Sequence, residues 1–241
     1  MLFRSCYHTR FPEYLAARYP IPKMASYALL RQFHNAAAAT LVATNSLKTE
    51  LTSHGFSKLK TWRRGIDLTL FNQGQSINLG VSGPVFLYVG RIAIEKNIEA
   101  FLKLDLPGTK IVVGEGPARQ ELQARFPKVC FLGLKSGQDL ANIYASADVF
   151  VFPSRTDTFG LVMLEALAAG TPVAAFPVSG PMEVLEGSRC GIMSEDLRLA
   201  ALMALEIPRE ACKAFASRHS IRDSAADFFS HIAAFRLARR M

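Results

Sequence analysis

Two acidic residues in the stretch PSRTDTFGLVMLEALAAG, residues 153–170, are the first candidates for chemistry. Asp157 precedes an expected helix and Glu165 lies inside its apolar part, with seven residues between them. A carboxylate on an apolar face is costly unless it is hydrogen-bonded. Sugar hydroxyls suit it, because an ionised carboxylate accepts two donors at once. The pair therefore predicts a polyol-binding cleft, whereas the simpler interpretation is a helix cap at Asp157 and a glutamate at the edge of the core.

Two cationic residues lie in a second stretch, VGRIAIEKN, residues 89–97. Arg91 and Lys96 are five residues apart, and Lys96 is expected to open a helix. Cations beside the N–H groups of a helix N-terminus can hold a diphosphate. The alternative interpretation is a pair of surface cations balanced by Glu95.

A third stretch, VGEGPAR at residues 113–119, begins like a dinucleotide-binding fingerprint. Arg119 stands where the third glycine belongs, and no acid follows about 20 residues later. Gly114 and Gly116 more simply let the backbone turn tightly or approach a ligand. A dinucleotide-dependent oxidoreductase is therefore the weakest of the functional interpretations.

The elements that must position these residues follow from the apolar pattern after residue 84. Apolar runs without period-2 alternation, separated by amphipathic stretches, indicate strands buried on both faces. The pattern predicts an α/β fold with a doubly wound parallel sheet, which binds ligands at the carboxyl ends of its strands. All three stretches begin at such ends. The expected strands are 84–90, 110–114, 129–133, 148–153, 172–176 and 190–193.

The first 66 residues differ from the rest of the chain. They predict two strands and two helices, too few for an independent sheet, because so small a domain rarely has a sufficient core. We therefore expect residues 1–66 to be the C-terminal remnant of a larger Rossmann-like domain. The polar segment 67–83 is expected to be a linker. A Rossmann-like domain at 84–208 and C-terminal helices at 209–241 follow, with a long final helix from about Ile221.

The positive charge of the chain is concentrated in its first quarter. Residues 1–66 hold ten Lys or Arg and two Asp or Glu, whereas residues 67–241 hold eighteen of each sign. This asymmetry favours an anionic partner, either a membrane surface or nucleic acid, although a solvated basic face explains it equally well. No basic run interleaved with aromatic residues resembles a nucleic-acid motif, so no nucleic-acid partner is expected.

Cysteine spacing and the length of apolar segments indicate whether the protein binds a metal, is secreted or spans a membrane. The four cysteines are scattered and no histidines cluster, so no metal site is expected. This cysteine usage suits a reducing compartment. No signal-peptide core is present at the start, and the most apolar window, 159–180, is interrupted by charge, glycine and proline. We expect a cytoplasmic protein, able to lie at the inner face of an anionic membrane through residues 1–66.

Four stretches together resemble family 4 retaining glycosyltransferases of the GT-B fold. They are VGRIAIEKN, VGEGP, ADVFVFPSRTDTFGLVMLEALAAGTPV and PVSGPMEVLE. The site motif of that family is Glu-x7-Glu, and Asp157 and Glu165 stand at its two acids. The resemblance implies that Asp157 contacts donor-sugar hydroxyls and that Glu165 binds the ribose. It also implies that Arg91 and Lys96 neutralise the diphosphate, with no cofactor and no metal.

The same resemblance implies further contacts with the nucleotide sugar. Backbone groups after the strands would line the sugar and the phosphates, and the end of the third strand would lie near the base. These positions are Gly90, Gly133, Leu134, Thr158, Phe159, Gly160 and Leu161.

The N-terminal segment is similar to the bacterial-type α-mannosyltransferases of this family that use GDP-mannose. The similarity lies in YHTRFPEYLAARYPIP, FHNAAAATLVATNSLKTEL and WRRGID. It implies that His8 reaches the donor sugar, although a lone histidine is more often structural. Two departures stand out. Asp157 is one methylene shorter than the family's glutamate, which tunes the choice of sugar. The chain also starts just before His8, so the first part of the acceptor-holding domain is expected to be absent.

The expected function is retaining transfer of a hexose, with mannose favoured, from GDP-mannose or another nucleoside diphosphate sugar to a lipid or glycan acceptor. The implied catalytic residues are His8, Arg91, Lys96 and Asp157. Because we expect the donor half to be complete and the acceptor half to lack its first part, the alternatives are a transferase that is inactive alone and a non-catalytic nucleotide-sugar-binding module. An oxidoreductase rests on GEGPAR alone.

Overall fold

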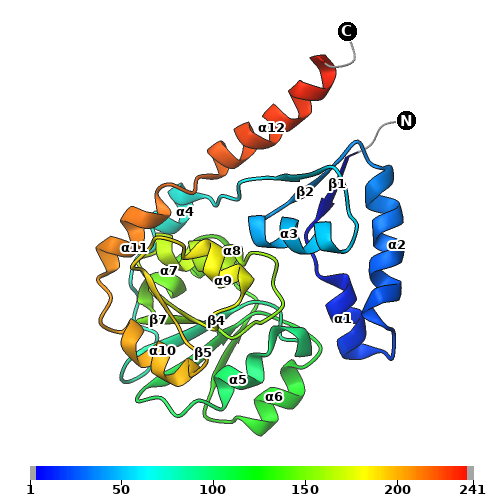
Figure 1. Ribbon diagram of the computed structural model, residues 1–241. Coiled ribbons are helices and arrows are strands. Elements are labelled where there is room, and N and C mark those ends of the chain that lie inside the picture. The colour runs from blue at the N-terminus through cyan, green and yellow to red at the C-terminus, as the bar shows by residue number, and fades with distance from the viewer. Residues whose placement is uncertain (1–3, 238–241) are drawn as a thin grey trace.

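The structure, a computed structural model, describes the backbone of residues 4–237 and the side chains of residues 4–231. Figure 1 shows two α/β lobes, a smaller one formed by the first part of the chain and a larger one that follows. Within the described residues, no helix combines the length and apolarity needed to cross a bilayer.

A three-stranded parallel sheet of order β1-β2-β3 forms the smaller lobe. Buried side chains such as Tyr27, Leu47 and Leu51 pack its helices onto the sheet. The elements are β1 (Arg4–Tyr7), α1 (Phe11–Arg18), α2 (Lys23–Ala36), β2 (Ala39–Val42), α3 (Asn45–Ser53) and β3 (Leu59–Thr61). Of these, β1 and α1 were not predicted from the sequence.

A six-stranded parallel sheet forms the larger lobe, in the order β6-β5-β4-β7-β8-β9. This is the order of doubly wound sheets, which reverses direction between the first strand and the fourth. The prediction of a doubly wound parallel sheet is therefore confirmed. The strands are β4 (Val85–Val89), β5 (Thr109–Val113), β6 (Cys130–Gly133), β7 (Val149–Phe152), β8 (Val173–Ala175) and β9 (Gly191–Met193).

Helices cover both faces of this sheet. Successive strand residues point to opposite sides, and since both sets of side chains are apolar, each face packs against its own layer of helices. Phe86 and Tyr88 of β4 pack on the face covered by α5 (Ile98–Leu102), α6 (Arg119–Arg125) and α10 (Leu197–Ala204). Leu87 and Val89 pack on the face covered by α7 (Gly137–Ser146), α8 (Leu161–Ala168) and α11 (Arg209–Ala216). The remaining elements are α4 (Leu68–Asn72), the 3₁₀ turn η1 (Ile94–Lys96), α9 (Ser179–Val184) and α12 (Ile221–Leu237).

The segment predicted to be a linker, 67–83, is packed. It contains α4, whose Phe71 is buried, and its Leu79 and Val81 pack against the core of the larger lobe. The polar composition of the segment concealed these apolar anchors.

The chain passes between the lobes twice, at adjacent positions. The Ile66 N–H donates to the His219 carbonyl at 2.9 Å, and the Ile221 N–H donates to the Ile66 carbonyl at 2.8 Å. Helix α12 then runs back along the smaller lobe (Figure 1), where Trp62 Nε1 donates to the Ser224 carbonyl at 2.8 Å. The final helix begins at Ile221 as predicted, and it fastens the smaller lobe to the larger.

Candidate functional site

A cavity of about 480 Å³ lies at the carboxyl ends of β4 and β7, where the strand order reverses. Loops that leave such a point turn to opposite faces of the sheet and leave a crevice for a ligand. The cavity is lined by His8, Arg64, Tyr88, Val89, Gly90, Arg91, Lys96, Phe152, Ser154, Asp157, Thr158, Phe159, Gly160, Leu161 and Val162. Of the predicted site residues, Glu165, Gly133 and Leu134 do not line it.

Side-chain bonds to the backbone lock the loops after β4 and β7 together. Asn97 adopts a left-handed conformation with a φ of 51°, and its Nδ2 donates to the Pro153 carbonyl at 3.0 Å. Thr156 Oγ1 donates to the Glu95 carbonyl at 2.9 Å. These bonds fix the two loops whose charged residues face the cavity.

Lys96 and Asp157 meet across these loops, because Lys96 Nζ donates to Asp157 Oδ1 in an ion pair. Burial disfavours the charged form of Lys96, but Asp157 and, to a smaller extent, Tyr14 more than offset this and raise the pKa of Lys96 above its usual value of 10.5. The cavity of the free protein therefore already holds a cation and a carboxylate side by side, both available to a ligand.

Two local interpretations of these residues are corrected. Lys96 ends the 3₁₀ turn η1, and the following helix begins at Ile98. Asp157 does not cap α8, whose N-cap is Gly160 in a left-handed conformation with a φ of 94°. The cap interpretation of Asp157 is wrong because its carboxylate turns to Lys96. Glu95 pairs with Arg18 at 2.7 Å and also interacts electrostatically with Arg91.

His8 reaches the cavity from the smaller lobe. Its carbonyl accepts a bond from Thr158 Oγ1 at 2.9 Å, and its Nδ1 is in contact with an NH2 group of Arg64. Because a guanidinium can only donate, Nδ1 must accept, and a neutral ring carries its proton on Nε2. Burial, followed by the charge of Arg64, lowers the pKa of His8. The ring is therefore neutral at neutral pH and presents a donor.

Arg64 also lines the cavity, although the sequence analysis did not predict it as a site residue. Its position in WRRGID follows β3, and only the fold shows that this turn reaches the cavity.

Glu165 has a partner inside the protein. The hydroxyl of Tyr144, on α7, donates to Glu165 Oε2 at 3.0 Å. Burial raises the pKa of Glu165, and the bond from Tyr144 lowers it part of the way back. The donor that a half-buried carboxylate requires is thus a tyrosine from the neighbouring helix, a residue that spacing along α8 could not reveal. Ribose binding by Glu165 stays a prediction.

Gly133 and Leu134 lie at the carboxyl end of β6, two strands away from β4. A Cβ on Gly133 would approach Glu115 Oε1 at 3.3 Å, and Leu134 is 73% exposed. They share the sheet edge with the cavity, and their contact with a base stays a prediction.

The glycines of GEGPAR serve close backbone packing. Gly114 has a φ of 134°, and a Cβ there would lie 2.0 Å from the Gly90 carbonyl oxygen. A Cβ on Gly116 would lie 2.2 Å from the Ile92 carbonyl oxygen. The loop after β5 therefore packs directly on the loop after β4, which accounts for both glycines without a dinucleotide.

Comparison with known proteins shows a family match over the larger lobe. Residues 83–206 match the model of the family described as glycosyl transferases group 1. The GDP-mannose-dependent alpha-mannosyltransferase of Mycobacterium tuberculosis is 34% identical over 197 residues, which are 78% of this chain and 52% of that protein. The sulfoquinovosyl transferase of Arabidopsis thaliana is 34% identical over 198 residues, 74% of this chain and 38% of that protein. The chain thus spans about half or less of these curated relatives.

Solved structures are similar in fold. Sucrose-phosphate synthase of Thermosynechococcus elongatus gives a TM-score of 0.81 at 21% identity, covering 98% of this chain and 68% of that one. HepE of Anabaena, in complex with UDP and glucose, gives a TM-score of 0.78 at 19% identity, covering 96% of this chain and 71% of that one. This likeness confirms the predicted GT-B-like arrangement of the fold.

Proposed function

Because the chain belongs to the glycosyl transferases group 1 family, we propose that it binds a nucleoside diphosphate sugar in the cavity between β4 and β7 and transfers its hexose with retention of configuration. GDP-mannose is the favoured donor, since relatives named as GDP-mannose-dependent alpha-mannosyltransferases match the chain. The acceptor is a lipid or a glycan. The observation that carries this proposal is the meeting of Lys96 and Asp157 with His8 in one cavity.

The cationic residues would stabilise the leaving diphosphate. Negative charge develops on it as the glycosidic bond breaks, and fixed cations aimed at that charge lower the barrier. Arg91 and Lys96 both line the cavity. Asp157, which holds Lys96 in the free protein, would accept a hydroxyl of the donor sugar while Lys96 turns to the phosphates. No metal ion is required in this scheme.

His8 would act as a neutral donor beside the sugar. An oxocarbenium-like carbon carries positive charge, and a neutral ring adds no further cation next to it. We assign no enzyme nucleophile. The acceptor hydroxyl would attack from the face that the diphosphate leaves, its proton passing to the departing phosphate oxygen, which retains the configuration.

Turnover of radiolabelled GDP-mannose into a lipid or glycan product tests this function. A nucleotide-sugar-binding module is the second candidate, favoured by the fact that, within the described residues, the smaller lobe lines the cavity with His8 and Arg64 alone. Calorimetric binding of GDP-mannose without turnover on any acceptor would favour the module. Binding of NAD in place of nucleotide sugars would refute both.

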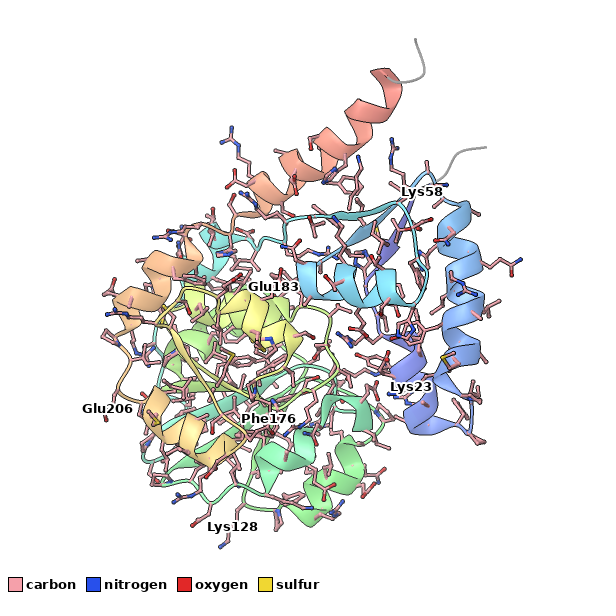
Figure 2. The ribbon with its side chains drawn as sticks, in the orientation of Figure 1. Lys23, Lys58, Lys128, Phe176, Glu183 and Glu206 are labelled. Atoms are coloured by element: carbon pink, nitrogen blue, oxygen red, sulfur yellow. The ribbon has the colours of Figure 1, made fainter. Side chains whose placement is uncertain are left out.

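The smaller lobe also supports a peripheral contact with an anionic membrane. Phe11, Met24 and Leu29 on α1 and α2 are 53%, 76% and 70% exposed, and Figure 2 shows Lys23 at the start of α2. Exposed apolar side chains beside basic ones suit an interface rich in anionic lipid. A lipid acceptor would be reached from such a surface.

A further inference from the structure

Arg64 is a half-buried cation without an acidic partner. One of its NH2 groups donates to His8 Nδ1, and its guanidinium carbon lies 4.0 Å from the centre of the Trp62 ring. Among the described side chains, no carboxylate lies within ion-pair distance of this guanidinium. Burial lowers the pKa of Arg64. The positive charge is therefore partly withdrawn from water and left uncompensated.

A second cavity, of about 440 Å³, adjoins the first at Arg64. Arg64 and Phe159 line both cavities. The second one extends between the carboxyl ends of β2 and β3, helix α9 and helix α12, and reaches Trp62 and His219. Arg64 thus stands at the junction between the proposed donor site and a further space that the donor scheme does not use.

The acids of the second cavity are already engaged. Glu183 Oε1 accepts from the Asn45 N–H at 2.9 Å, and Figure 2 shows Glu183 on α9 beside α3. Asp227 Oδ2 accepts from the Arg63 N–H at 2.8 Å. Neither carboxylate forms an ion pair with Arg64, and each has its own hydrogen-bond donor, so the guanidinium of Arg64 is left to an anion that enters the cavity.

We propose that the second cavity binds the acceptor substrate through an anionic group, a phosphate or a carboxylate, that Arg64 neutralises. This inference rests on the proposed transferase function and names the class of acceptor. A cation that is partly withdrawn from water is less stable without a counterion, and a ligand can supply that counterion. A guanidinium has five N–H donors, of which His8 engages one group, so a bidentate grip on an anion remains open. An acceptor held there lies beside His8, next to the donor sugar.

The test titrates sn-glycerol 3-phosphate, with glycerol as the neutral control, into the full chain saturated with GDP. GDP occupies Arg91 and Lys96, so the second anion reports on Arg64. We expect the phosphate to bind and glycerol not to bind. Arg64→Met should weaken phosphate binding about tenfold or more, and Arg64→Lys should retain part of it. Lys60→Met, which removes an exposed positive charge from the same segment, should leave it unchanged.

A second arm replaces glycerol phosphate with micelles of a short-chain phosphatidylglycerol. Binding that depends on Arg64 in this arm alone would assign the anion to a lipid headgroup, and binding of the free phosphate alone would assign it to a soluble acceptor. The inference is overturned if neither probe binds, or if the Arg64→Met variant binds both probes as tightly as the wild type does. It is also overturned if Arg64→Met lowers the affinity for GDP as much as it lowers the affinity for the phosphate. Failure of the wild type to bind GDP would instead refute the proposed function, and the same titrations without GDP would then test Arg64 by itself.

Discussion

Replacing Tyr144 with phenylalanine tests whether a buried hydrogen bond keeps Glu165 ionised. Tyr144 is fully buried, and its hydroxyl donates to Glu165 Oε2 at 3.0 Å. Tyr144→Phe removes the hydroxyl and leaves the ring contacts with Phe71 and Phe150. A hydrogen bond to a charged group contributes about 1.5–3 kcal/mol. We expect the free energy of unfolding at neutral pH to fall by an amount in this range.

The sign of the pH dependence follows from the pKa of Glu165, which burial raises above 4.5 and the Tyr144 bond partly lowers. Because the folded pKa exceeds the unfolded one, stability linked to Glu165 is complete below the unfolded value and is lost as the pH rises through the folded value. Removing the hydroxyl raises the pKa of Glu165 further. Tyr144→Phe should therefore destabilise the protein more at about pH 8 than at about pH 5.

Urea unfolding at both pH values measures this effect, and Glu165→Gln provides the matched background. In the Glu165→Gln background, which carries no charge at this position, Tyr144→Phe should lower the free energy of unfolding by less. The loss should also no longer depend on pH, so the double-mutant cycle should show coupling between the two residues. Equal destabilisation at both pH values, or the same loss in the Glu165→Gln background, would refute the reasoning.

Other residues of the site and the fold give further predictions. Glu165→Ala should weaken GDP affinity in calorimetry, whereas Asp157→Ala should mainly lower turnover of labelled donor; equal and negligible effects would contradict both roles. Gly114→Ala should lower the Tm by several degrees in calorimetric scans, because its Cβ would lie 2.0 Å from the Gly90 carbonyl oxygen; an unchanged Tm would show that the loops can separate freely. Co-sedimentation with anionic vesicles should fall as salt rises, and binding that ignores salt would count against electrostatic docking.

The larger lobe could be predicted because its central strands β4, β7 and β8 are buried on both faces. A run such as VFLYV, which forms β4 and is buried throughout, carries its own signal. The loops after β4 and β7 could be predicted as a site for the same reason, since parallel strands end at one edge. Arg91, Lys96 and Asp157 then follow from their positions in the sequence.

Other features depend on neighbours that a sequence does not specify. The strand β1, RSCY, is short and contains two polar residues, so its pattern is weak. The roles of Tyr144 and Arg64 require knowing which helix lies beside α8 and where the turn after β3 points. The hydrogen bond from Tyr144 to Glu165 could not be predicted because the two residues lie on different helices.

Calorimetric titration of GDP into the wild type, Arg91→Met and Lys128→Met tests the central claim most directly. Arg91 lines the cavity at the carboxyl end of β4, whereas Lys128 is exposed just before β6, at the opposite edge of the sheet, and is labelled in Figure 2. We predict saturable binding to the wild type, unchanged affinity in Lys128→Met and an affinity about tenfold or more lower in Arg91→Met. Absence of binding to the wild type, or equal affinity in all three proteins, would contradict a diphosphate site between β4 and β7.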